Sequence, residues 1–191
     1  MRISFHFPAA FIFSLSLFFH LNTRAQETGT LKDSDDGRVY KTIKIGNQWW
    51  MAENLNYYTP EGSWCYNNDS LNCVKYGRLY DWETAKKICP RGWHLPTRAE
   101  FELLIENTEQ NGTNAYVPLI KNGSSGFDAI LGGQLTSSDA FFDLNSNGYY
   151  WTTSQDYLEH IWYFNFYNEN GNLFFYFSKD VKALSVRCLK N

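Results

Sequence analysis

The chain has 191 residues, with 17 Lys and Arg against 20 Asp and Glu, which gives a formal net charge of −3 at pH 7. A mildly acidic chain of this length is expected to form one ordinary domain, and it lacks the excess of positive charge that attracts nucleic acid or an anionic membrane. We therefore expect neither as a partner.

The first 25 residues have the pattern of a secretory signal peptide. Arg2 gives a positive start, an apolar run covers 11–19, and small residues up to Ala25 precede Gln26. The apolar run is too short to span a bilayer comfortably, although an uncleaved anchor is the alternative. We expect an exported protein, secreted, periplasmic or on the cell surface, with no membrane span after removal of residues 1–25.

The exported part begins with strand-like patterns. Residues 26–37 are polar and are expected to form a loose N-terminal lead, so that the domain itself covers 38–191. Alternation over 39–45, a two-residue turn at Gly46-Asn47 and a return over 48–52 predict a hairpin. Residues 53–75, rich in turn-forming side chains, are expected to be irregular.

Two helix signals follow. Asp81 is a suitable N-cap for a helix from Trp82 to about Cys89. Thr97 and Glu100 match a capping box for a second helix, which is expected to end between 108 and 112.

The second half of the chain reads as loops and then strands. Residues 112–148 are expected to form long loops with short strands near 129–131 and 140–144. Strands are predicted over 149–154, 160–168, 173–178 and 183–189, with a type I′ turn at Asn170-Gly171. This order predicts an α+β fold, with an antiparallel sheet, two flanking helices and long loops.

All four cysteines, Cys65, Cys73, Cys89 and Cys188, lie in the exported part. An even count in an exported chain favours disulfides, and metal binding would need close pairs such as C-x2-C, which are absent. Three pairings are possible. Cys65 and Cys73 can close a small ring in one loop-like segment, which leaves Cys89 with Cys188. Closing that long loop would contribute about 4–5 kcal/mol in the chain-entropy model.

The segment 82–103 resembles the helical half of a C-type-lectin-like domain. The resemblance lies in Trp82, Ala85, Cys89 and the sequence HLP at 94–96. In that fold a cysteine that ends the first helix bonds a cysteine on the final strand, and Cys89 and Cys188 fit these places. The resemblance implies a lectin-like scaffold.

Nearly the whole exported chain is similar to a bacterial family, the Fibrobacter succinogenes major paralogous domain. The similar blocks are DGRVYKTIKI (36–45), QWWMAENLN (48–56), YGRLY (76–80), CPRGWHLPT (89–97), YWTTS (150–154) and SVRC (185–188). This likeness implies an exported bacterial module on a lectin-like scaffold, and it implies no particular activity.

Calcium is the first ligand to weigh, because many lectins of that fold hold sugar through it. The Glu-Pro-Asn or Gln-Pro-Asp loop and the Trp-Asn-Asp strand motif of those lectins are absent here. Asp143, Asn145, Asn147 and Gly148 imitate the start of a calcium loop, but Ser154 stands where a bidentate Glu is needed. A plain Asn/Gly turn is favoured, and we expect no metal and no cofactor.

Catalysis has few candidate residues. His94 and His160 are the only histidines after residue 25, and His94 is expected to be a structural hydrogen-bonding residue rather than a general base. Formylglycine-generating enzymes share a related scaffold, but they require paired active cysteines late in the chain, where this sequence has Cys188 alone. A non-catalytic protein is therefore expected.

Aromatic residues make up 18% of the chain, and most of them are expected to lie in the core. Along 160–168, Trp162, Phe164 and Phe166 share one face of the predicted strand. The opposite face carries Tyr163, Asn165 and Tyr167, with Phe174 and Tyr176 across from them. Such rings and amides can form a stacking surface for a sugar or a protein, or they can cover a second layer of core.

The function that fits best is an exported, non-catalytic binding or adhesion module with a glycan or protein ligand. The alternatives are a structural cell-surface component without a small ligand, and an enzyme of the formylglycine-generating type.

Overall fold

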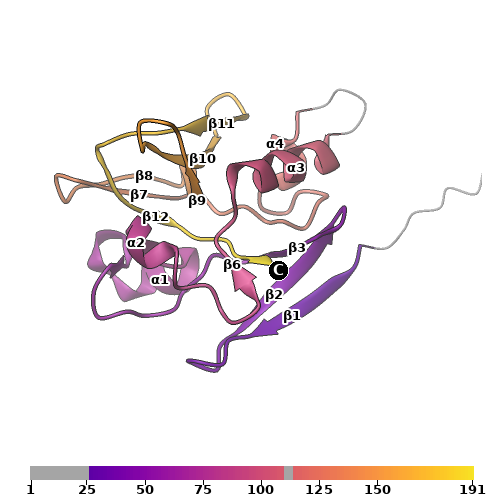
Figure 1. Ribbon diagram of the computed structural model, residues 1–191, viewed down its shortest axis with the longest axis horizontal. Helices are drawn as coiled ribbons and strands as arrows, with labels where there is room; N and C mark the ends of the chain where they lie inside the picture. Colours follow the sequence, from indigo (N-terminus) through magenta and orange to yellow (C-terminus); the bar gives the residue numbers. More distant parts are fainter. Residues whose placement is uncertain (1–25, 110–113) are drawn as a thin grey trace, which may run out of the picture.

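The computed structural model describes residues 26–109 and 114–191. The predicted signal peptide lies outside the described residues. None of the helices within the described ranges is long and apolar enough to cross a membrane. Figure 1 shows the strands in two groups, with the longest helix beside them.

The α+β class is confirmed, but the single antiparallel sheet expected from the sequence is two sheets. In the described chain the first sheet has the strand order β1-β2-β3-β13-β6. Its strands are β1 (Thr28–Lys32), β2 (Val39–Ile45), β3 (Gln48–Met51), β6 (Trp93–His94) and β13 (Leu189–Lys190). The second sheet has the order β11-β10-β9-β7-β12-β5-β4, with β8 paired to β7. Its strands are β4 (Ser63–Trp64), β5 (Leu79–Tyr80), β7 (Gly132–Thr136), β8 (Phe141–Leu144), β9 (Asn147–Gln155), β10 (Ile161–Tyr167), β11 (Asn172–Tyr176) and β12 (Val181–Ser185).

The pairing is not entirely antiparallel either. β9 runs parallel to β12, with Ser185 opposite Tyr150, and parallel to β7, with Gly133 opposite Gly148. The predicted last strand, 183–189, is divided between the two sheets as β12 and β13, so the C-terminal segment joins them.

The N-terminal part differs from its prediction. Residues 28–32, expected within a loose lead, form β1, which pairs antiparallel with β2 from Thr28–Ile43 to Lys32–Val39. The polar side chains that suggested a lead fit an edge strand, because one side of such a strand stays in water. The β2–β3 hairpin is confirmed, and Gly46 takes the positive φ of 58° that its two-residue turn requires.

The helices are α1 (Ser70–Tyr76), α2 (Trp82–Ala85), α3 (Arg98–Thr108) and α4 (Tyr116–Leu119), with a 3-10 turn at Tyr66–Asn68. The predicted capping box of α3 is confirmed, since the Thr97 side chain accepts from the Glu100 N–H and Glu100 accepts from the Thr97 N–H. Asp81 caps α2 as predicted, accepting from Thr84 N at 2.8 Å.

The predicted helix 82–89 is too long, because α2 is a single turn that ends at Ala85. Cys89 is disulfide-bonded and precedes Pro90, and a residue before proline avoids the helical conformation. Helix α1, by contrast, lies in the segment expected to be irregular. Its N-cap is Asp69, whose carboxylate accepts from Leu71 N at 2.9 Å.

Both predicted disulfides are present. Cys65–Cys73 closes a short ring around the 3-10 turn and the start of α1, and Cys89–Cys188 spans a sequence separation of 99. The second bond fixes the segment after α2 to the segment between β12 and β13, close to the join of the two sheets.

The core lies between the two sheets and α3. Its first cluster joins Trp50 of β3, Phe101 of α3 and Phe164 of β10, with ring centroids of Phe101 5.0 Å from Trp50 and 4.8 Å from Phe164. A second cluster joins Tyr80 of β5 and Leu184 of β12 to the first sheet. Burying this much aromatic and aliphatic surface is the main stabilising contribution.

One charged side chain, Arg187, is completely buried in this core. Its Nε donates to Asn54 Oδ1 at 2.7 Å, its Nη1 to the carbonyls of Met51 (3.0 Å) and Phe127, and its Nη2 to the carbonyl of Asp128 at 2.7 Å. Burial lowers the pKa of Arg187. The guanidinium thus ties the C-terminal segment to two distant loops through backbone carbonyls.

Candidate functional site

The candidate site is built on the β10–β11 hairpin. The two strands pair from Tyr163–Tyr176 to Tyr167–Asn172. A four-residue loop, 168–171, connects them, so the predicted two-residue type I′ turn at Asn170-Gly171 is wrong. That turn needs positive φ at both central residues, and here Gly171 (φ 63°) has it whereas Asn170 does not.

One face of the hairpin packs into the core. Phe164 and Phe166 are fully buried in the first cluster, and Phe175, opposite Phe164, packs against the same cluster. The Arg98 guanidinium of α3 lies 4.6 Å from the centroid of the Trp162 ring and 4.9 Å from that of Phe175. The sequence pattern had placed Trp162, Phe164 and Phe166 together, and the structure shows that their face is the inner one.

The opposite face gathers the five residues that were predicted as a ligand surface. Because directly paired and alternate residues of an antiparallel hairpin share a face, these side chains lie side by side. We call this surface the tyrosine face: Tyr163, Asn165, Tyr167, Phe174 and Tyr176. Phe174 is 46% exposed and Tyr176 is 59% exposed.

Tyr163 requires a correction, because it does not offer its ring to solvent. It is only 4% exposed and lies edge-on against Trp151 and Tyr149 of β9, at centroid distances of 6.1 and 5.9 Å. Burial raises the pKa of Tyr163 to about 12, with a smaller effect from the phenol of Tyr176. Its ring instead supports Tyr176, whose centroid is 6.0 Å away.

The polar members of the face are half-buried. Asn165 lies between Tyr149 of β9 and Phe174 of β11 in the strand register, and within the described chain its Oδ1 accepts no hydrogen bond. Tyr167 donates its hydroxyl to Glu169 Oε2, and this hydrogen bond raises the pKa of Tyr167. The face therefore combines two exposed rings with a phenol, while the Asn165 amide oxygen beneath them is shielded from solvent.

The predicted Asn/Gly turn at 143–148 lies next to this face. Tyr149 donates its hydroxyl to Asp143 Oδ2 at 2.6 Å, and Asn147 Nδ2 donates to the same hydroxyl at 3.1 Å. Asn145 Oδ1 accepts from Tyr76 at 2.9 Å. Two oxygens that imitated a calcium loop, Asp143 Oδ2 and Asn145 Oδ1, thus accept hydrogen bonds from tyrosine hydroxyls of β9 and α1. Burial and the Asp143 carboxylate raise the pKa of Tyr149.

The two histidines are each held by neighbours. His94 has its Nδ1 2.6 Å from Asn191 Oδ1 and its Nε2 3.0 Å from Glu100 Oε1. It therefore links β6, the start of α3 and the C-terminus, in line with the structural role predicted for it. His160 has Nδ1 2.9 Å from Asp156 Oδ2, and its ring stacks on Phe177 with centroids 4.6 Å apart.

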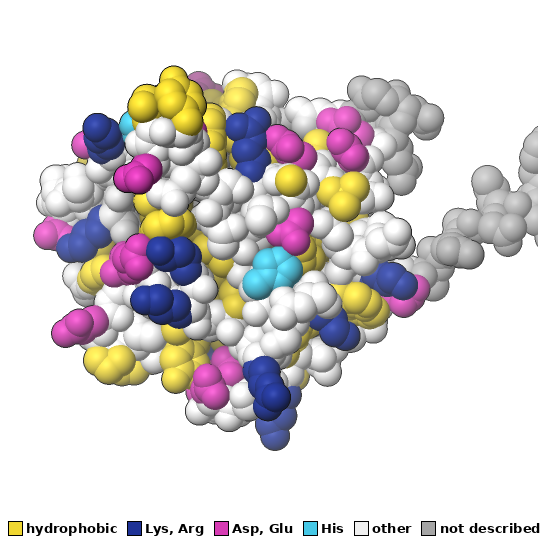
Figure 2. Space-filling view, in the orientation of Figure 1, with side chains coloured by type: hydrophobic (Ala, Val, Ile, Leu, Met, Phe, Trp, Pro, Cys, Tyr) yellow, Lys and Arg dark blue, Asp and Glu magenta, His cyan; other side chains and the backbone are white. Residues whose placement is uncertain are grey.

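Exposed apolar side chains continue around the hairpin. Figure 2 shows hydrophobic side chains gathered at the end of the molecule that holds β10 and β11. Those with large exposure here are Tyr157, Leu158, Phe174, Tyr176 and Phe177. Exposed rings in such a group are a feature of recognition surfaces.

A family model described as the Fibrobacter succinogenes major domain matches residues 43–190. This range includes both disulfides, Arg187 and the whole tyrosine face. No curated protein and no solved structure matches the chain.

Proposed function

The chain belongs to the Fibrobacter succinogenes major domain family, and we propose that this member is an exported, non-catalytic binding module that holds a carbohydrate on its tyrosine face. Two disulfides support export, because such bonds persist in oxidising compartments. Neither leaves a free thiol among the four cysteines, which supports a non-catalytic role over the formylglycine-generating type.

The observation that carries the proposal is the exposure of Phe174 and Tyr176 on a fixed platform. Tyr176 rests on buried Tyr163, and both rings project from paired strands. The apolar faces of a sugar ring can stack on such side chains, while sugar hydroxyls can hydrogen-bond to a phenol such as that of Tyr167. A preformed platform also loses little entropy when a ligand binds.

We further propose that the scaffold is C-type-lectin-like. The Cys89–Cys188 bond joins the segment after α2 to the last strands, as the resemblance implies, and α3 packs beside the sheet. The tyrosine face would then be an alternative to the calcium-dependent sugar site of that fold, because the turn at 143–148 directs Asp143 and Asn145 to tyrosine hydroxyls.

We expect residues 26–191 to bind a set of glycans on a carbohydrate array, and a Phe174→Ala/Tyr176→Ala variant to bind the same glycans at least about tenfold more weakly, a loss of about 1.4 kcal/mol. Both rings are partly exposed, so the variant should melt close to the parent protein.

The matched control is Phe142→Ala, which removes a ring that is 51% exposed but lies on β8, outside the tyrosine face and the exposed apolar group around the hairpin. Its binding should be unchanged. Equal losses in both variants would show non-specific adhesion and contradict the proposal. Binding to proteins of a surface panel without any glycan signal would assign the face to a protein partner, and silence on both panels would favour a structural component.

A further inference from the structure

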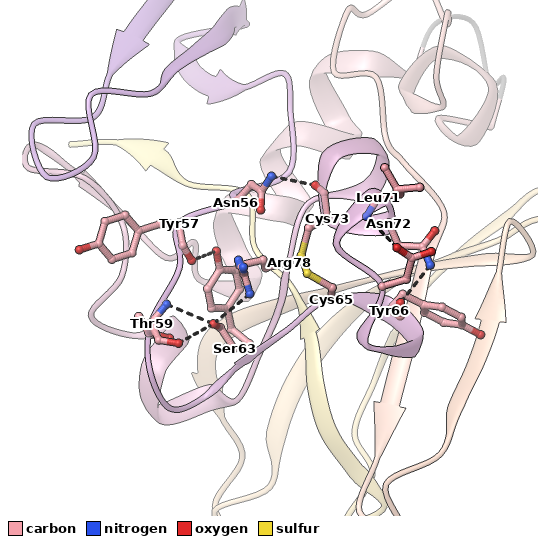
Figure 3. Close-up of a disulfide and its surroundings, with 12 residues drawn as sticks. Asn56, Tyr57, Thr59, Ser63, Cys65, Tyr66, Leu71, Asn72, Cys73 and Arg78 are labelled. Carbon is pink, nitrogen blue, oxygen red and sulfur yellow. Dashed lines mark hydrogen bonds between the residues drawn. A yellow bond between two sulfur atoms is a disulfide. The ribbon is translucent and has the colours of Figure 1, made fainter.

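A second concave region lies beside the Cys65–Cys73 disulfide, and none of its residues belongs to the tyrosine face. Its volume is about 420 Å³, within the range of small-molecule pockets. Asp35, Asp36 and Arg38 line it from the turn before β2, Tyr57 and Tyr58 from the segment after β3, and Val74 and Arg78 from α1 and the residues that follow. Figure 3 shows Arg78 lying between the disulfide and the loop that carries Ser63.

The walls of this pocket are fixed by buried contacts. Asn56 Nδ2 donates to the Cys73 carbonyl at 2.8 Å, and Tyr80 donates its hydroxyl to the Tyr57 carbonyl at 2.8 Å (Figure 3). The disulfide closes the ring that holds the start of α1. The pocket is therefore preformed, and a ligand would not have to order its walls.

Arg78 is a cation without a charged partner. Within residues 26–109 and 114–191 it forms no ion pair, and its guanidinium makes one long hydrogen bond, from Nη1 to Ser63 Oγ at 3.5 Å. Its Nε is shielded from solvent and has no hydrogen-bond partner there. The Tyr58 ring lies 4.9 Å away and is 62% exposed. A guanidinium without a charged partner is suited to bind a carboxylate, which accepts hydrogen bonds from two parallel N–H groups.

Two carboxylates, those of Asp35 and Asp36, also line this pocket. Asp36 Oδ1 accepts from the backbone N–H of Arg38 at 2.8 Å, whereas its contact with the Arg38 side chain is long, at 3.8 Å. The Asp35 side chain accepts one hydrogen bond from the described residues, from Ser34 Oγ at 3.3 Å, and this bond is exposed to solvent. Both carboxylates line the same pocket as Arg78, and within the described residues neither forms an ion pair with it, so a ligand in this pocket would meet charges of both signs.

Such a pocket is complementary to a small molecule that carries one positive and one negative charge. A dianion such as phosphate would meet the carboxylates of Asp35 and Asp36, and a simple cation would meet the guanidinium groups of Arg38 and Arg78, so either would be repelled by part of the lining. An α-amino acid carries a carboxylate for Arg78 and an ammonium for Asp35 and Asp36. The exposed rim, Tyr58 and Val74, would cover an apolar side chain.

We propose that this pocket binds a free α-amino acid with an apolar side chain, and that Arg78 holds its carboxylate. The site is separate from the tyrosine face, so it is independent of the carbohydrate proposal. The test is calorimetric titration of residues 26–191 with L-leucine and L-phenylalanine, beside N-acetyl-L-leucine, which lacks the ammonium, and L-leucinamide, which lacks the carboxylate.

At least one free amino acid should bind, and each blocked compound should bind at least about tenfold more weakly. In ¹⁵N–¹H NMR spectra the Nε–H signal of Arg78 should shift with the free amino acid. Arg78→Met should abolish binding, whereas Arg91→Met, which removes an exposed arginine outside the pocket, should not change it.

Asp36→Asn provides a second variant whose turn survives, because the asparagine oxygen still accepts from the Arg38 N–H. This variant should bind the free amino acid more weakly, and its weak affinity for N-acetyl-L-leucine should be unchanged. No binding by either amino acid, equal binding of the blocked compounds, or full affinity in Arg78→Met would each overturn the proposal. The Phe174→Ala/Tyr176→Ala variant should retain amino-acid binding, so this test and the carbohydrate test fail separately.

Discussion

Replacing Arg187 with methionine is expected to lower the free energy of unfolding by about 3 to 5 kcal/mol, because several buried oxygens lose their donor and each one left unsatisfied costs about 1–3 kcal/mol. The variant keeps the length of the side chain but removes every donor to Asn54, Met51, Phe127 and Asp128. Their oxygens would stay buried without a hydrogen bond, and each such group is costly. Urea unfolding followed by tryptophan fluorescence measures the change.

Two further variants show whether the effect comes from the buried guanidinium. Arg187→Lys keeps a positive charge but not the planar fork, so it should lose less than Arg187→Met and still be clearly destabilised. Arg91→Met removes an exposed arginine and should change the unfolding free energy by less than about 0.5 kcal/mol. A loss below about 1 kcal/mol in Arg187→Met would show that the carbonyls find other partners.

Removing the Cys89–Cys188 bond in a Cys89→Ser/Cys188→Ser variant is expected to cost about 4 to 5 kcal/mol. The bond closes a loop with a sequence separation of 99, and in the chain-entropy model the gain grows with the length of the closed loop. Cys188 is also fully buried in the second cluster, beside the join of the two sheets. Thermal or urea unfolding of the oxidised proteins gives the difference.

The matched control is Cys65→Ser/Cys73→Ser, which opens a loop with a separation of only 8. The same model predicts a loss of about 2 to 3 kcal/mol for this pair. Equal losses in the two variants would contradict the view that the longer bond acts as the main long-range link of the fold.

The features that the sequence predicted well depend on neighbouring residues. The capping box at Thr97 and Glu100 and the N-cap at Asp81 are satisfied within three residues, so the local pattern defines them. The same holds for the two-residue turn between β2 and β3. The disulfides followed from the short spacing of Cys65 and Cys73, which left the other two cysteines to pair.

The features that were missed depend on distant parts of the chain. Residues 28–32 form a strand only because β2 lies beside them, and the division of 181–190 into β12 and β13 reflects the partners of each strand. Helix α1 had a local signal in its N-cap Asp69, but the surrounding turn-forming residues obscured it. Tyr163 alternates correctly with its neighbours, yet Trp151 and Tyr149 cover it.

The two candidate sites show the same contrast between features set by neighbouring residues and features set by distant ones. Alternation along β10 placed the tyrosine face residues together before their exposure was known. Arg78 appeared only within the block YGRLY, and nothing in that pattern set it apart from a surface arginine. Within the described residues it has no charged partner, and it lines one pocket with Asp35 and Asp36, which come from a distant segment of the chain.

The most direct test of the central claim is a ¹⁵N–¹H NMR titration of residues 26–191 with soluble neutral oligosaccharides. We expect saturable shifts that centre on Asn165, Tyr167, Phe174 and Tyr176, the accessible part of the tyrosine face. Neutral sugars should leave the signals around Arg78 unchanged, because that pocket requires a charged ligand. No shift with any oligosaccharide, or shifts confined to residues away from β10 and β11, would contradict the proposed function.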